Sequence, residues 1–214
     1  MRRLLTGLLG VTLLVSACGD DDDGDRSAVT SIPERSTTTS TTTTAPAVPP
    51  PDVIPEDVSL ITEEYVEQVL NALYEVSLEA LLLAREEGLV DQPSIELAES
   101  IRTPEHALEA VNSLIEIAAE GFPGYRENPG PTTADVRDVI IATNACVFAE
   151  VEFDSSETIE EPAPPPPELR AFVELRTASS EQRTSGNPTA WVVAGLPTTL
   201  DGTVPPSGCD DAAS

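Results

Sequence analysis

The clearest β-strand signal in the chain is VIIATNACVFAEVEF at residues 139–153. Side chains at every second position share one face of a strand. Here that face is apolar or small, and the other face includes Glu150 and Glu152; the apolar series is Val139, Ile141, Thr143, Ala145, Val147, Ala149, Val151 and Phe153. This alternation is typical of an antiparallel sheet covered on one side. It predicts one long, bent strand.

Two later stretches repeat the alternation and predict two further strands. Residues 169–175 place Leu169, Ala171, Val173 and Leu175 on one face, and residues 191–194 read WVVA. The loop between the first two strands contains Pro162 and four prolines at 164–167, which favour an extended polyproline segment. The three strands are expected to form a meander.

Helical periodicity precedes the strands. Residues 57–87 carry one apolar stripe with steps of three or four, which is formed by Ile61, Tyr65, Val69, Leu73, Val76, Ala80 and Leu83. A second helix is expected at 93–102. A third is expected to begin at Thr103-Pro104-Glu105 and end at Gly121. Its expected inward residues are Ala107, Leu108, Val111, Leu114, Ile115 and Ala118. Helices followed by strands indicate an α+β fold, with the helices packed on a curved antiparallel sheet of three to four strands.

The N-terminus has the layout of a secretory signal. Residues 1–18 read MRRLLTGLLGVTLLVSAC, with two arginines, a short apolar core, small residues and then Cys18. Residues 19–56 hold an Asp run, nine consecutive Ser/Thr residues at 36–44 and several prolines, which is typical of a disordered spacer. The chain therefore divides into a signal peptide (1–17), a tether (18–56) and a single α+β domain (57–214).

Val15-Ser16-Ala17-Cys18 resembles a bacterial lipobox. This resemblance implies cleavage before Cys18, a diacylglyceryl thioether on its sulfur and usually an acyl chain such as palmitate on the new amino group. It also implies an extracytoplasmic protein that is anchored to the outer face of the cell membrane, because two or more acyl chains hold a protein stably. The alternative is an ordinary signal peptide that is cut nearby, with Cys18 incidental.

The order of the elements and the segments NACVF (144–148), FVEL (172–175) and AWVV (190–193) resemble the nuclear transport factor 2-like, or ketosteroid isomerase-like, superfamily. Small lipoproteins of high-G+C Gram-positive bacteria that join such a domain to a Thr/Pro tether are particularly similar. The resemblance would cover residues 57–209 and implies a cone of sheet and helices. Enzymes of this superfamily place a carboxylate and a Tyr or His at the mouth of the cone; the candidates here are Tyr65, Tyr74, Asp135 and Asp138.

The three cysteines divide by compartment. If Cys18 carries the lipid, Cys146 and Cys209 remain outside the cytoplasm, where an oxidising environment permits a disulfide. On a chain-entropy model, closing the loop between residues 146 and 209 contributes about 4 kcal/mol to the free energy of unfolding. The alternative is two reduced thiols, with Cys146 a small buried residue.

Composition excludes several functions. The chain has 38 acidic residues, 11 arginines and no lysine, for a net charge of −27, which excludes binding to phosphate backbones. Three cysteines and the single His106 do not form a Cys/His zinc site of the usual kind. We therefore expect no nucleic-acid partner, no metal and no cofactor, and interpret His106 as a surface residue.

The remaining function classes depend on whether the domain is hollow. Five aromatic residues either line a hydrophobic pocket or fill the interface of helices and sheet: Tyr65, Tyr74, Phe148, Phe172 and Trp191. The first hypothesis is a non-enzymatic envelope lipoprotein that binds a protein partner or a small apolar ligand. The alternatives are an isomerase or dehydratase of the cone type and a structural spacer without a ligand.

Overall fold

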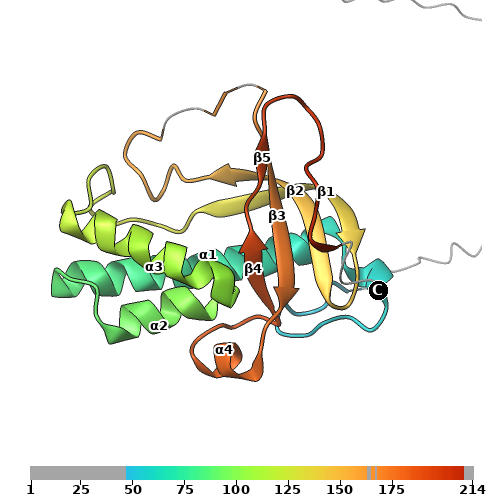
Figure 1. The fold of residues 1–214 in the computed structure, drawn as a ribbon, viewed down its shortest axis with the longest axis horizontal. Helices are drawn as coiled ribbons and strands as arrows, with labels where there is room; N and C mark the ends of the chain where they lie inside the picture. Colours follow the sequence, from blue (N-terminus) through green and yellow to red (C-terminus); the bar gives the residue numbers. More distant parts are fainter. Residues whose placement is uncertain (1–46, 163–164, 167, 210–214) are drawn as a thin grey trace, which may run out of the picture. The chain divides into compact units, whose positions relative to one another are not determined.

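The computed structural model describes residues 47–162, 165, 166 and 168–209. They form an α+β domain in which helices precede a curved antiparallel sheet (Figure 1). The helices are a 3-10 turn (Val58–Leu60), α1 (Glu63–Glu87), α2 (Gln92–Ser100), α3 (Pro104–Ala119) and α4 (Ser180–Thr184). The strands are β1 (Thr133–Ala142), β2 (Cys146–Asp154), β3 (Arg170–Thr177), β4 (Trp191–Gly195) and β5 (Thr198–Thr199). The predicted α+β class is confirmed.

The sheet follows the chain order β1-β2-β3-β4, and β5 pairs with β3 beside this path. β4 pairs with the second half of β3 and β5 with its beginning. A register shift between Glu174 and Leu175 lies within the pairing of β3 with β4. Leu196 and Pro197 therefore stand between β4 and β5, where proline has no ladder hydrogen bond to donate.

Helix α1 connects the sheet to the other helices. The Thr62 side chain accepts a hydrogen bond from the amide of Tyr65 at its start, and Gly88 adopts a left-handed conformation (φ 67°) at its end. The first half of α1 packs on the sheet in the main core, to which it contributes Tyr65, Val66, Val69, Leu70, Leu73 and Val76. Its second half forms a smaller core with α2 and α3. One helix thus takes part in both cores.

The sheet carries apolar groups on its other face as well. There Phe148 and Phe172 stack with ring centroids 5.5 Å apart, beside Cys146 and Cys209. The segment before Cys209 lies over this face, because the amide of Gly208 donates to a carboxylate oxygen of Glu174 at 2.8 Å. The C-terminal part of the domain therefore protects apolar groups that the helices do not reach.

The long first strand expected from the sequence is instead a hairpin. Residues 143–145 turn the chain between β1 and β2. The Thr143 hydroxyl accepts from the amide of Cys146 at 2.9 Å, and the Thr143 amide donates to the Cys146 carbonyl at 2.8 Å. Threonine makes such local bonds in place of ladder bonds. The expected three strands of the meander therefore become four, with the short β5 in addition.

The boundary between tether and domain also differs from the expectation. Val48 and Ile54 pack against the main core, although both fall in the expected tether. The Tyr65 hydroxyl donates to the carbonyl of Val53 at 2.7 Å, and the amide of Ala190 donates to the carbonyl of Pro51 at 2.9 Å. Proline has no amide hydrogen to donate, but the carbonyls of a proline-rich segment can still accept hydrogen bonds. Through these bonds the last residues of the expected tether belong to the folded domain.

Helix α3 agrees with the expectation at Val111 and Leu114 and differs from it at Leu108 and Ile115. Leu108 is 67% exposed and Ile115 is 45% exposed, whereas both were expected to face inward. Val111 and Leu114 are the buried residues of this helix. The face that α3 presents to the rest of the domain includes polar residues, because a cavity lies there. Sequence periodicity predicts that such a polar face is solvent-exposed.

Candidate functional site

A cavity of about 700 Å³ lies between the three long helices and the end of β4. The second half of α1, Ala98 of α2 and one face of α3 line it on the helical side. Residues 193 and 195–197 line it from the sheet, and Tyr125, Thr132 and Thr158 line it from loops and the approach to β1. Its size falls in the range of small-molecule sites in proteins.

Small side chains leave this space open. Ala80, Ala98 and Ala110 line the cavity from three different helices, and each fills little of the room between them. Leu81, Leu114 and Ile117 provide larger apolar surface around it. Apolar surface therefore predominates in the cavity wall, together with several polar side chains that include Ser77, Ser113 and Thr132.

The main chain of Arg102 is fixed at the edge of the sheet. Arg102 follows α2 and forms a parallel bridge with Val193 of β4. The amide of Val193 donates to the carbonyl of Ile101 at 2.9 Å, and the amide of Thr103 donates to the carbonyl of Val193 at 3.1 Å. The short segment between α2 and α3 thus extends the sheet and holds Arg102 against the cavity.

A buried polar network supports this segment from below. The side-chain amide of Asn187 donates to the carbonyl of Ser100 at 3.1 Å and to that of Trp191 at 2.8 Å. Its oxygen accepts from the amide and the hydroxyl of Thr189. A buried network with every member bonded has one favoured arrangement, so the end of α2 is held in one position relative to β4.

The guanidinium group of Arg102 has no hydrogen bond or ion pair with any residue that the structure describes. Burial lowers the pKa of this group, while the Tyr74 phenol and the Glu109 carboxylate act in the opposite direction. Burial disfavours a charged group when no partner compensates for the lost water. Arg102 is therefore a partly buried cation in the cavity wall, without a partner among the described residues.

Tyr74 is the second polar group of this kind. Its ring packs edge-on against Phe153, with centroids 5.4 Å apart, and burial raises the pKa of its phenol. Its hydroxyl has no hydrogen-bond partner among the residues that the structure describes. The charge of Arg102 acts on this phenol and lowers the pKa. The cavity wall thus contains a phenol and a guanidinium whose donors have no partner among the described residues.

His106 and Glu109 lie near the rim of the same cavity. The Nδ1 atom of His106 is 3.6 Å from a carboxylate oxygen of Glu109, and the two side chains are 44% and 81% exposed. Solvent weakens a contact between groups this exposed. The carboxylate of Glu109 therefore belongs to the mouth of the cavity and not to its interior.

Of the five aromatic residues proposed for a pocket, the structure places only Tyr74 in the cavity wall. Tyr65 and Trp191 are fully buried in the main core, where the indole N–H donates to the Tyr65 hydroxyl at 2.8 Å. Phe148 and Phe172 lie on the opposite face of the sheet. This placement corrects the expected pocket, because four of the five aromatic residues fill space elsewhere.

The acidic candidates also lie away from the cavity. Asp135 and Asp138 are exposed on β1, and Asp135 pairs with Arg137 at 3.2 Å. Neither is among the residues that line the cavity. Neither Asp135 nor Asp138 therefore supplies the cavity carboxylate that the resemblance to cone-type enzymes implies.

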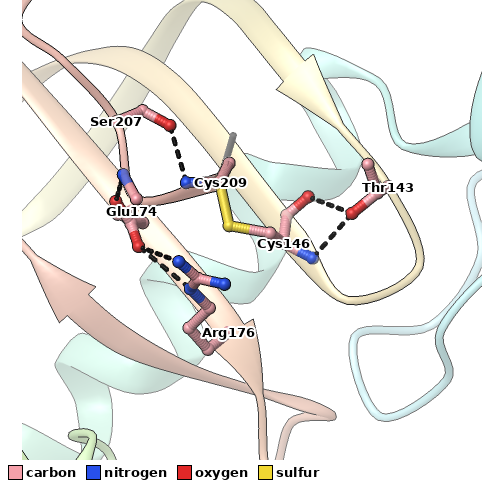
Figure 2. A network of polar contacts seen from close by, with 7 residues as sticks. Thr143, Cys146, Glu174, Arg176, Ser207 and Cys209 are labelled. Carbon is pink, nitrogen blue, oxygen red and sulfur yellow. Dashed lines mark hydrogen bonds and ion pairs between the residues drawn. A yellow bond between two sulfur atoms is a disulfide. The ribbon is translucent and has the colours of Figure 1, made fainter. Parts of the chain in front are cut away.

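The predicted disulfide between Cys146 and Cys209 is present, with the Cα atoms 5.5 Å apart. Figure 2 shows it on the far face of the sheet, beside the ion pair of Arg176 and Glu174 (2.8 Å) and a hydrogen bond from the Cys209 amide to the Ser207 hydroxyl. Glu174 lies close to both sulfur atoms. The bond between the sulfurs uses them, so this group is not a metal site. Cys18 lies outside the described residues.

Arg102 is the functional candidate that sequence reasoning missed. It sits in the sequence Ser-Ile-Arg-Thr-Pro, between a helix end and a helix start, where a solvent-exposed arginine is common. The signal that could have identified Arg102 is its place in a short link between two helices, because side chains of such a link lie where the helices meet.

Comparison of the chain with protein-family models, with curated proteins and with solved structures finds no match. Within the described residues, no helix combines the length and apolar character that crossing a bilayer requires. The interpretation of the cavity therefore depends on its own geometry.

Proposed function

We propose that this protein is a cell-envelope lipoprotein whose cone-like α+β domain binds a small, mainly apolar ligand in the cavity between α1, α2, α3 and β4. The observation that carries the proposal is the cavity itself, about 700 Å³ in volume and lined mainly by apolar side chains. A structural spacer has no need of a pocket of this size. A ligand-binding protein requires it.

The geometry favours binding over catalysis. A cone-type isomerase needs a carboxylate inside the cavity that removes or delivers a proton. The one carboxylate among the lining residues is Glu109, whose side chain is 81% exposed. The interior groups are the guanidinium of Arg102 and the phenol of Tyr74, which suit recognition of a ligand.

Two features support a location outside the cytoplasm. The lipobox-like segment ends at Cys18, and the bond between Cys146 and Cys209 is of a kind that persists in oxidising compartments. The strongly acidic composition suits an exposed domain that must stay soluble on its tether. The lipid at Cys18 would then hold the ligand-binding domain at the membrane surface.

Filling the cavity tests the binding function. The chain from Gly19 to Ser214 should bind Nile red, a neutral apolar dye, with increased fluorescence, and Ala110→Leu should abolish this increase. Ala119→Leu is the matched control, because it adds the same side chain to an exposed position of α3 outside the cavity. Absence of dye binding to the unmodified chain, or equal binding by both variants, would contradict the proposal.

The anchor has its own test. Cys18→Ser should release the protein from the membrane fraction into the medium, because the variant has no sulfur for a thioether. Metabolic labelling with palmitate should mark the unmodified protein and not the variant. A variant that remains in the membrane fraction would disprove the lipid anchor and leave the proposal for the cavity unaffected.

A further inference from the structure

The arginines of the folded part differ sharply in their partners. Arg137, Arg170 and Arg176 pair with acidic side chains. Three others donate to main-chain carbonyls, namely Arg85 to Arg126, Arg126 to Ser156 and Arg183 to Asp52. Among the described residues, Arg102 alone has neither kind of partner for its guanidinium group.

This exception does not come from a shortage of acids. The chain has 38 acidic residues for 11 arginines, and acids lie on every helix near the cavity. An arginine that is partly buried loses some of its hydration, and Arg102 has no partner among the described residues that replaces it. Local rules that a protein breaks without visible compensation commonly mark a functional position.

The free donors around Arg102 define a site for an anion. The guanidinium offers a planar fork that matches the two oxygens of a carboxylate. Tyr74 and Arg102 both line this cavity, and the charge of Arg102 acts on the Tyr74 phenol. Apolar surface from Leu81, Leu114 and Ile117 continues from these groups along the same cavity.

We infer that the ligand is a small amphiphile with a single carboxylate head, which the guanidinium of Arg102 binds in bidentate fashion while the Tyr74 hydroxyl donates a further hydrogen bond. The apolar body of the ligand lies along α1 and α3. This inference rests on the proposed function, since it names the ligand class for the same cavity.

Charge selects a carboxylate over a phosphate. One guanidinium compensates one negative charge, and a phosphate monoester near neutral pH carries close to two. The protein has a net charge of −27, so its field repels each additional negative charge on a ligand. The electrostatic free energy of entering the cavity is therefore less unfavourable for a monoanion than for a dianion.

The test compares decanoate with decanamide, which has the same chain and a neutral head. Calorimetric titration of the chain from Gly19 to Ser214, at concentrations where both compounds are monomeric, should show decanoate binding at least roughly tenfold more tightly. Arg102→Met should weaken decanoate roughly ten- to hundredfold and leave decanamide within about twofold. Tyr74→Phe should weaken decanoate roughly threefold.

Arg183→Met is the matched control, because it removes the same charge at an exposed position outside the cavity. It should leave both affinities unchanged. Equal binding of decanoate and decanamide, or an Arg102→Met variant that keeps the preference, would overturn the carboxylate site while the binding function stands. If neither decanoate nor decanamide bound, both proposals would be overturned. Tighter binding of decyl phosphate than of decanoate would overturn the assignment to a carboxylate.

Discussion

The two halves of α1 belong to one continuous helix but differ in how densely they pack. The first half meets the sheet with large side chains, and Tyr65, Val66, Val69 and Leu70 are each completely buried. The second half meets α2 and α3 through Ala80 and other small residues, with a cavity beside them. Filled space specifies the fold, because dense packing favours one arrangement. The ligand site that we propose lies at the hollow end.

Removing a large side chain from the filled end should have the largest effect. Trp191→Ala deletes a fully buried ring and its hydrogen bond to Tyr65, so it should lower the free energy of unfolding by about 3–5 kcal/mol. Urea denaturation followed by circular dichroism measures this loss. A loss below about 1 kcal/mol would mean that the sheet side is less well packed than the structure shows.

The disulfide stabilises the filled end from the far face of the sheet. Replacing both Cys146 and Cys209 with serine should lower the free energy of unfolding by about 2–4 kcal/mol, because the unfolded chain loses a long closed loop. Thermal unfolding with and without reductant should show the same difference in the unmodified protein. Ligand affinity should change little, because the cavity lies on the other side of the sheet. Free thiols in the oxidised protein by mass spectrometry would refute the bond.

The filled end was largely predictable from sequence, and the hollow end was not. Alternating apolar residues in 146–154 and 170–177 and the apolar run at 191–194 identify β2, β3 and β4, each of which contributes residues to the main core. The same alternation runs through Thr143 and Ala145, so it hides the turn between β1 and β2 that local hydrogen bonds of Thr143 create. Pattern alone does not distinguish a bent strand from a tight hairpin.

The cavity depends on contacts between distant segments. Arg102 is held by β4 through Val193, and no local pattern near residue 102 contains that partner. The polar residues of α3 that face the cavity resemble a solvent-exposed face in sequence, which is why Leu108 and Ile115 were assigned inward. The sequence left open whether the five aromatic residues line a pocket or fill space. Four of them are buried elsewhere, and small residues such as Ala80 line the cavity.

A pair of leucines compares the two ends directly. Leu70→Ala removes a side chain with no exposure from the main core and should cost about 3–4 kcal/mol. Leu114→Ala removes a side chain that already borders the cavity, so it leaves fewer contacts behind and should cost about 1–2 kcal/mol. Chemical denaturation of both variants measures the difference. Equal losses would mean that the helical end is packed as densely as the sheet end.

Arg102→Met should have the smallest effect on stability, and its sign is the informative result. The substitution keeps an apolar stem and removes a partly buried cation that has no partner among the described residues, so the ligand-free protein should gain about 0.5–1 kcal/mol. Arg170→Met should have the opposite sign, because it leaves Glu150 without the guanidinium that lowers its pKa.

If Arg102 had a structural role, its removal would destabilise the domain as the removal of Arg170 does. A gain in the free energy of unfolding, together with the loss of decanoate binding, would separate the two roles, because a residue kept for folding does not lower stability. Denaturation of the ligand-free variants, repeated with decanoate, measures both terms. Decanoate should then stabilise the unmodified protein more than Arg102→Met, since a ligand stabilises the folded state according to its affinity.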